Sequence, residues 1–297
     1  MGAPYDEMNL QMLERVSHYL NRCPRFITRE DAEEIASCGV SREEAARMLL
    51  GEALGIADSR AMMERYLRES FRILDARVIT ENPYVKAVTF PEVRAGGWTM
   101  TTLSYAPYEV FVRDDLLCLP DGREIPQLGC FDREVAYPAV LQDGREWMTV
   151  TPNEIATMEA AVRAARGHTV AMGLGLGYYA FMAGMKEEVS QVTVVERDAQ
   201  VIALFTRYIL PQFPHREKIC IVQADAFDYV RRQLLQDRAD YVFADLWHDV
   251  ADGAPLYMGM KAAEAQLRAQ HAIVPPFGYW IETSIRSFLD GLARDGN

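Results

Sequence analysis

The sequence predicts an α/β fold whose C-terminal half forms a parallel sheet, preceded by a helical segment and a small antiparallel β unit. Three observations predict it. After residue 165, short apolar or β-branched strands alternate with helical segments, the connections are short, and each strand ends in a glycine or a carboxylate. Such alternation gives a parallel sheet, and ligands bind at the carboxyl ends of its strands. The second half of the chain is therefore expected to bind a ligand.

The first 80 residues are predicted to form a helical N-terminal region. Apolar residues recur at helical spacing from residue 5 to about residue 77. Ser41 followed by Glu44 is a capping-box pattern, in which a hydroxyl and a carboxylate satisfy the free N–H groups at a helix start. We find few candidate catalytic or binding residues in this part of the sequence.

Residues 81–150 are predicted to form the antiparallel β unit. Four segments have the β-branched and aromatic content of strands, namely Val85–Phe90, Thr99–Leu103, Glu109–Val112 and Val135–Leu141. The Asp-Gly pairs at 121–122 and 143–144 are typical of hairpin turns. We expect this unit to lie over the mouth of the ligand site.

A sharp junction begins the predicted ligand-binding domain, residues 151–297. Thr151-Pro-Asn-Glu154 combines an N-cap, a proline at the first helical position and a glutamate placed to bond back to the cap. The helix should show one apolar face, and Gly167 is expected to end it. We expect it to pack on the sheet just before the first strand.

The most informative motif is the turn at 169–177, Thr-Val-Ala-Met-Gly-Leu-Gly-Leu-Gly, with an apolar helix after it. Glycine permits a tight turn and a close approach of ligand to main chain, and the helix start directs N–H groups at that ligand. Two ligand classes compete, because Gly175, Gly177 and Ala180 also satisfy the dinucleotide fingerprint G-x-G-x-x-A. A turn without a ligand is the plain alternative.

Acidic residues follow the next three strands. Glu196 ends the second strand, 19 residues beyond Gly177, where a carboxylate can accept the ribose hydroxyls of either ligand class. Asp225 and Ala226 follow the third strand, and Asp245 ends the fourth. Carboxylates therefore gather at one edge of the predicted sheet.

Over about residues 151–283 these motifs resemble the class I S-adenosylmethionine-dependent methyltransferases, and within them the spermidine/spermine synthase-like branch. Val-Glu-Arg-Asp at 195–198 is similar to the Val-Glu-Ile-Asp of polyamine synthases. The resemblance implies a Rossmann-like methyltransferase sheet with a short C-terminal end. It also implies that Gly173, Gly175 and Gly177 cradle the methionine part of S-adenosyl-L-methionine.

The same resemblance implies roles for residues at the other strand ends. Glu196 would hold the ribose. Asp225 and Ala226 would recognise the adenine amine, and Asp245 would face the substrate amine or the cofactor's amino group. Further residues adjoin these and complete the expected cofactor-binding set: Leu174 and Arg197.

The chain also departs from the family pattern. Polyamine synthases have Gly-Gly-Gly-Asp-Gly in the turn, where this chain carries Leu174 and Leu176. Their Asp-x-Ser/Thr-Asp-Pro signature after the fourth strand is replaced by Asp-Leu-Trp-His-Asp at 245–249. These departures leave the predicted fold and cofactor class unchanged. They do not support the prediction of an aminopropyl donor or a polyamine acceptor.

Two residues are the catalytic candidates, Asp245 and His248. Transfer from a sulfonium mainly requires alignment of the nucleophile with the methyl group, and a carboxylate can bind an ammonium or take its proton. His248 could serve as a general base, with a solvated loop histidine as the alternative. Together with Asp249 they could hold a divalent metal, but we expect no metal site.

Composition excludes several other classes of function. The net charge of −12 opposes binding to a phosphate backbone, so nucleic acid is not an expected partner. The uncharged stretch 167–185 is too glycine-rich for a membrane span, and the N-terminus lacks a secretory pattern, so we expect a cytoplasmic protein. The five cysteines are scattered, which argues against a disulfide framework and a structural zinc site, and we expect Cys220 to be a core residue.

We therefore expect a transferase that moves the methyl group of S-adenosyl-L-methionine to a small-molecule acceptor, for which an amine is one candidate. The alternatives are an aminopropyl or aminobutyryl transferase of polyamine-synthase or nicotianamine-synthase type, an NAD-dependent oxidoreductase, and a nucleoside-binding protein without catalysis. The C-terminal end is too short for the hairpin that usually closes the sheet, so a homodimer is one way to cover the edge.

Overall fold

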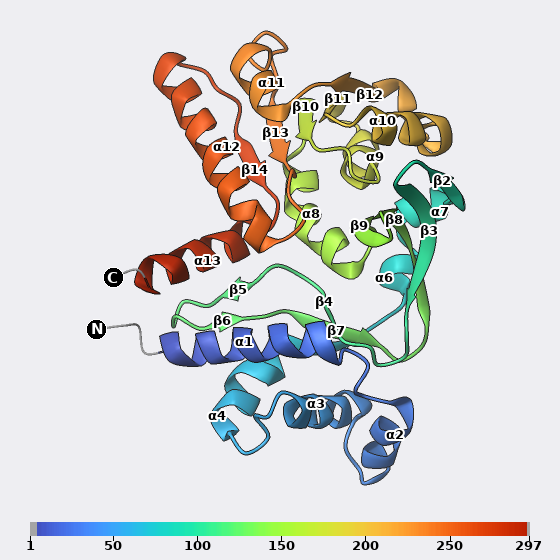
Figure 1. The fold of residues 1–297 in the computed structure, drawn as a ribbon, viewed down its shortest axis with the longest axis vertical. Coiled ribbons are helices and arrows are strands. Elements are labelled where there is room, and N and C mark those ends of the chain that lie inside the picture. Colours follow the sequence, from blue (N-terminus) through green and yellow to red (C-terminus); the bar gives the residue numbers. More distant parts are fainter. Residues whose placement is uncertain (1–4, 296–297) are drawn as a thin grey trace. The chain divides into compact units, whose positions relative to one another are not determined.

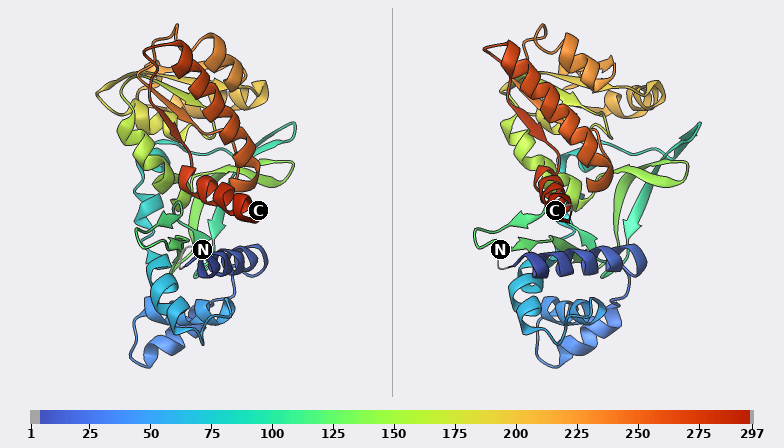
Figure 2. Two further views of the ribbon diagram at one scale, coloured as in Figure 1. Left: turned by 90° about the vertical axis from the view of Figure 1, so that its left-hand side faces the viewer. Right: turned by 60° about the vertical axis from the view of Figure 1, so that its left-hand side comes forward.

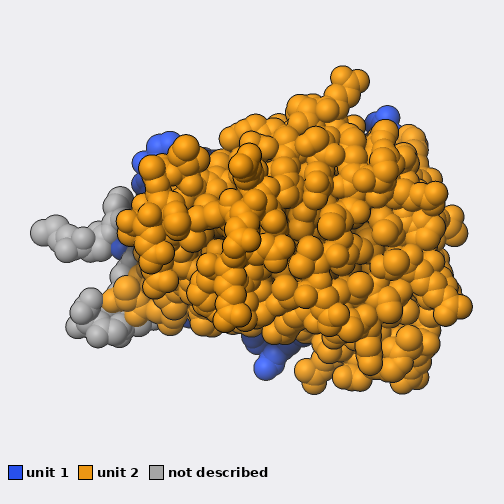
Figure 3. Space-filling view, turned by 90° about the horizontal axis from the view of Figure 1, so that it is seen from above, with its two compact units in different colours: residues 1–80, 103–136, 151–156 blue, residues 81–102, 137–150, 157–297 orange. Residues whose placement is uncertain are grey.

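The computed structural model describes residues 5–295 (Figure 1). The chain forms two compact units. Unit 1 comprises residues 1–80, 103–136 and 151–156, and unit 2 comprises residues 81–102, 137–150 and 157–297 (Figure 3). Segments of the 81–150 region thus belong to both units.

Unit 1 is mainly helical. Its helices are α1 (Asp6–Arg22), α2 (Arg29–Ser37), α3 (Arg42–Ala53), α4 (Arg60–Met62), the π-helix η1 (Met63–Leu67), α5 (Arg68–Ser70) and α6 (Arg77–Thr80). Its strands are β1 (Phe71–Leu74), β4 (Phe111–Val112), β5 (Leu117–Cys118), β6 (Glu124–Ile125) and β7 (Leu128–Phe131). Strand β1 pairs in parallel with β7, which ties the helical region to the later strands. Ser41 caps α3 as predicted, since its hydroxyl accepts the N–H of Glu44, but the Glu44 carboxylate pairs with Arg47 instead of completing a capping box.

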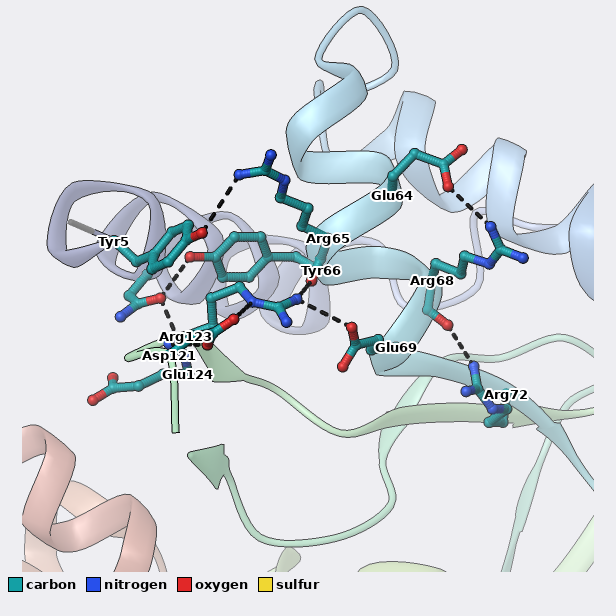
Figure 4. Close-up of polar contacts among 11 residues, drawn as sticks. Tyr5, Glu64, Arg65, Tyr66, Arg68, Glu69, Arg72, Asp121, Arg123 and Glu124 are labelled. Carbon is teal, nitrogen blue, oxygen red and sulfur yellow. Dashed lines mark hydrogen bonds and ion pairs between the residues drawn. The ribbon is translucent and has the colours of Figure 1, made fainter. Parts of the chain in front are cut away.

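A polar network holds α1 and η1 to the β5–β6 hairpin in unit 1 (Figure 4). Asn9 is buried, and its side-chain oxygen accepts hydrogen bonds from the Tyr66 hydroxyl, at 2.7 Å, and from the N–H of Glu124, at 3.1 Å. The Arg123 guanidinium forms ion pairs with Glu69 and Asp121. These polar groups satisfy one another, so the network is structural.

Unit 2 contains a five-stranded sheet in the order β12-β11-β10-β13-β14, with every neighbouring pair parallel. The strands are β10 (Gly167–Met172), β11 (Val189–Glu196), β12 (Ile219–Gln223), β13 (Tyr241–Ala244) and β14 (Phe277–Tyr279). The expected α/β parallel sheet is confirmed, and its order is consistent with a Rossmann-like arrangement. The order reverses between β10 and β13, and such a switch point is where open α/β sheets bind ligands.

Helices precede, connect and follow the strands of this sheet. They are α8 (Pro152–Ala164), α9 (Tyr178–Gly184), α10 (Ala199–Leu204), the π-helix η2 (Phe205–Ile209), the 3₁₀ turns η3 (Leu210–Gln212) and η4 (Arg216–Lys218), α11 (Ala226–Arg232), α12 (Val250–Gln270) and α13 (Glu282–Asp295). Helices α11 and α12 pack against each other (Figure 2). Among the described residues, no helix is both long and apolar enough to cross a membrane.

A second sheet of unit 2 has the order β2-β3-β8-β9. It consists of two neighbouring hairpins (Figure 2), formed by β2 (Val93–Ala95) with β3 (Trp98–Tyr105) and by β8 (Val135–Gln142) with β9 (Arg145–Thr149). The antiparallel β unit was thus predicted, but its segment 85–90 was not a strand. Asn82 caps a helix there, α7 (Pro83–Ala87), because an N-cap followed by proline at the first position overrides β-propensity.

Two other sequence-based expectations in unit 2 were wrong. Helix α8 ends at Ala164, and Gly167 begins β10 with a φ of +50°. Cys220 is exposed rather than buried, because β12 is an edge strand with one open side. Strand β14 forms the other edge within the described part of the chain.

Candidate functional site

The glycine turn connects β10 to α9 at the switch point of the sheet. Gly173, Gly175 and Gly177 have φ values of +97°, +54° and +75°, a region that side chains rarely adopt. A Cβ on Gly173 would lie 1.9 Å from the main-chain oxygen of Asp245, and one on Gly177 would lie 2.3 Å from the Phe205 ring. The first and third glycines are therefore required by packing, and the first fixes the turn against the end of β13.

Helix α7 and its N-cap residue hold the glycine turn and the start of α9 through two hydrogen bonds. The Tyr84 hydroxyl donates to the carbonyl of Leu176 at 2.7 Å, and the Asn82 amide donates to the Tyr178 hydroxyl at 3.1 Å. Tyr84 is fully buried, and burial raises the pKa of its hydroxyl well above the ordinary range. Sequence reasoning missed this support, although the Asn82-Pro83 pair is a helix-start signal that could have indicated it.

Glu196 lies at the carboxyl end of β11, beside the turn. One carboxylate oxygen accepts the N–H of Leu174 at 3.2 Å, and the other accepts the N–H of Asp198 at 2.8 Å. A carboxylate has about four acceptor positions, so each oxygen retains capacity for one more donor. The structure therefore brings Glu196 and the turn together, with an acceptor pair still able to receive two hydroxyl groups.

Three other predicted cofactor residues lie at the ends of β11 and β12. Asp225 is exposed and caps α11, since its carboxylate accepts the N–H of Asp228 at 3.0 Å. Ala226 is buried behind it. Arg197 is exposed and lines an open hollow of about 590 Å³, together with Asp198 and Gln223 from these strand ends and the tips of the two hairpins.

Asp245 follows β13 and lies across the switch point from the turn. Its N–H donates to the carbonyl of Met172 at 2.9 Å, which continues the β10–β13 pairing. Asp245 is half-buried, and its carboxylate receives no hydrogen bond from the described residues. Desolvation by the surrounding protein raises the pKa of this carboxyl from its ordinary 3.8 to about 7. The carboxylate is thus a partly exposed acceptor that has no donor among the described residues.

The loop after Asp245 buries one aromatic residue and exposes another. Trp247 is buried, and its indole N–H has no acceptor among the described residues. His248 is exposed, and its Nε2 donates to the carbonyl of Glu146 in β9 at 3.1 Å. The His248 ring stacks on Trp147, with the ring centres 5.6 Å apart. Asp249 caps α12.

Strand β9 reaches the glycine turn, in line with the expectation that the β unit lies over the ligand site, although the sequence did not indicate which residue makes the contact. A Cβ on Gly175 would meet only the Met148 sulfur, at 3.5 Å. A cavity of about 10 Å³ remains between Met148 and the apolar residues around the turn. An exposed-looking hairpin sequence carries no signal for this contact, because it depends on where the second sheet packs.

No cluster of three or more His, Cys, Asp or Glu side chains that could hold a metal ion is found within residues 5–295. His248 and Asp249 lie 3.9 Å apart between Nδ1 and Oδ2. The donor set at the switch point consists of carboxylates, glycine main chain and aromatic rings, which suits an organic ligand with hydroxyl and amino groups.

No protein-family model matches the chain, and no curated protein matches it. Among solved structures, it is similar to a spermidine synthase from Thermotoga maritima, with 17% identity, a TM-score of 0.31, and coverage of 44% of this chain and 50% of that chain. It is also similar to MNMC2 from Aquifex aeolicus, with 16% identity, a TM-score of 0.25, and coverage of 70% and 64%. The chain thus spans half to less than two thirds of those proteins.

Proposed function

We propose that the chain binds S-adenosyl-L-methionine at the 173–177 turn and transfers its methyl group to a small-molecule acceptor. The observation that carries this proposal is the partly desolvated carboxylate of Asp245, which has no donor among the described residues and follows β13 at the switch point, where the Asp245 main chain adjoins Gly173. A partly desolvated carboxylate without a protein donor is unfavourable, and a ligand ammonium or amine would satisfy it.

The residues around the turn fit this cofactor. The remaining acceptor positions of Glu196 suit the two ribose hydroxyls. Only Met148 adjoins Gly175 on the side where a Cβ would lie, so a ligand could approach the main chain there once Met148 moves aside. The indole N–H of Trp247 is a buried donor that would suit a ligand oxygen.

When bound, S-adenosyl-L-methionine would supply an electrophilic methyl group on a sulfonium. Transfer to an amine acceptor would replace the carbon–sulfur bond by a carbon–nitrogen bond, with S-adenosylhomocysteine as the leaving group, and the methylated amine would have to lose a proton. Asp245 can take that proton, because a carboxyl with a pKa of about 7 is a better base near neutral pH than an ordinary aspartate. His248 is a weaker candidate, since its Nε2 donates to Glu146.

Isothermal titration calorimetry would test the proposal with four ligands: S-adenosylmethionine, S-adenosylhomocysteine, decarboxylated S-adenosylmethionine and NAD. We expect the first two to bind and NAD not to bind. Preference for the decarboxylated form would favour an aminopropyl transferase instead. Binding of NAD alone would refute the proposal.

Glu196→Gln tests where the nucleoside binds. The amide cannot accept from both hydroxyls, and charge-assisted hydrogen bonds are worth roughly 1.5–3 kcal/mol, so S-adenosylhomocysteine affinity should fall about ten-fold or more. Glu187→Gln is the matched control, since Glu187 is exposed elsewhere in unit 2. Equal affinity in both folded variants would place the ligand away from β11.

A further inference from the structure

The tip of the β8–β9 hairpin, residues 141–149, is here called the strap. Within residues 5–295, strand β9 pairs only with β8 and is an edge of its sheet. Its residues Arg145, Glu146 and Trp147 are exposed. Edge segments with few buried contacts open at low free-energy cost. The strap therefore has the character of a segment that can move while the rest of unit 2 stays folded.

The strap covers the glycine turn through Met148. The Met148 sulfur lies 3.5 Å from the position of a Cβ on Gly175, and the cavity left beside it is about 10 Å³. One water-sized probe needs about this volume, so no organic ligand fits there in this arrangement. A ligand directly above Gly175 must displace Met148, and with it the strap.

A β-bulge turns one strap residue toward the loop after β13. Val140 pairs with Met148 and Leu141 pairs with Glu146, so Trp147 has no partner across the ladder. Bulges re-aim side chains in this way. The Trp147 ring stacks on His248, at 5.6 Å between ring centres and 29° between planes, and its other neighbour is Trp98, at 6.0 Å.

A hydrogen bond adds to this stack. The Nε2–H of His248 donates to the carbonyl of Glu146 at 3.1 Å, immediately before the bulge. The N–H of His248 itself donates to Asp252 at 3.1 Å, in the first turn of α12. His248 thus links helix α12 to the edge strand β9.

We propose that the strap is a gate over the cofactor site and that the Trp147–His248 stack is its latch. His248 then acts as a positioning residue through Trp147 and Met148. This inference rests on the proposed function for the identity of the ligand, but the latch itself belongs to the ligand-free protein.

Hydrogen–deuterium exchange of the ligand-free protein tests the latch. Trp147→Ala and His248→Ala should each speed exchange of the strap amides, roughly two- to ten-fold, the range expected for loss of one aromatic pair. Trp147→Phe and His248→Phe keep stacked rings and should exchange more slowly than the alanine variants. Phe288→Ala is the control, because Phe288 is similarly exposed, 38% against 40% for Trp147, but lies on α13. Unchanged strap exchange in both alanine variants would overturn the proposal.

Stopped-flow binding of S-adenosylhomocysteine tests the gate. In the wild type the observed rate should reach a plateau at high ligand concentration, set by strap opening. The alanine variants should raise that plateau two- to ten-fold, and the control should not. A rate that rises linearly with the same slope in every protein would refute gating. Failure of the ligand to bind any variant would count against the proposed function, whereas the exchange measurement decides the latch independently.

Discussion

Replacement of Asp245 by asparagine should stabilise unit 2 at alkaline pH. The carboxyl has a pKa of about 7 in the folded protein against an ordinary 3.8. Between these values the folded state holds a proton that the unfolded state has lost. Stability therefore falls as pH rises from about 4 to about 7 and is constant above that. Asparagine keeps the shape of the protonated acid and removes this loss.

The magnitude follows from the two pKa values. One pKa unit corresponds to about 1.4 kcal/mol, so the ionised carboxylate costs the fold at most about 4 kcal/mol above pH 7. Asp245 is half-buried, and solvent screening reduces this figure. We expect Asp245→Asn to be more stable than wild type by about 1–3 kcal/mol at pH 8 and by no more than about 1 kcal/mol at pH 4.5.

Urea unfolding followed by tryptophan fluorescence is the assay. The four tryptophans are Trp98, Trp147, Trp247 and Trp280, and all belong to unit 2, so the signal reports this unit alone. With a slope of about 2 kcal/mol/M, the midpoint should rise by about 0.5–1.5 M at pH 8.

Asp290→Asn is the matched control, because Asp290 is exposed on α13 and its replacement should leave the midpoint unchanged at both pH values. An Asp245→Asn variant that is less stable than wild type at pH 8 would refute the reasoning, since it would mean that a donor satisfies the ionised carboxylate. In the same variant, turnover of an amine acceptor should fall sharply while S-adenosylhomocysteine still binds.

Four further substitutions test the contacts that stabilise the two units. Gly173→Ala should lower the free energy of unfolding by more than about 3 kcal/mol or prevent folding, because its Cβ would lie 1.9 Å from a carbonyl oxygen. Gly175→Ala should lower it by about 1–2 kcal/mol, because only its positive φ is unfavourable for alanine. Urea midpoints would show the difference. Tyr84→Phe removes a buried hydrogen bond to the turn and should cost about 1–3 kcal/mol, with thermal unfolding as the measurement. Asn9→Ala leaves the Tyr66 hydroxyl unpaired and should lower unit 1 stability by a similar amount, seen by circular dichroism, while tryptophan fluorescence of unit 2 is unaffected.

The local sequence predicted much of the parallel sheet. The strands that end at Met172, Glu196 and Ala244 were expected from β-branched runs and from the glycine or carboxylate that follows each. Such patterns are local, because a strand's face and a turn's φ values depend on neighbouring residues. The helix at 83–87 was missed because aromatic and β-branched content outweighed the Asn-Pro signal in the interpretation.

The site was predictable only in part for the same reason. The sequence placed Glu196 beside the turn, but it could not show that both carboxylate oxygens also hold main-chain N–H groups. Nor could it distinguish Asp225, which caps a helix at the surface, from Asp245, which lacks a donor. Both are carboxylates after strands, and only their surroundings differ.

The sequence by itself determined the order of strands and helices in the C-terminal half, the glycine turn and the carboxylates at the strand ends. Tertiary structure alone decided which of those groups are desolvated, and it brought Met148 onto Gly175 and Trp147 onto His248. The reason is physical. Conformational preferences act between neighbours in the chain, whereas desolvation and ring stacking depend on contacts between residues that lie far apart in the sequence.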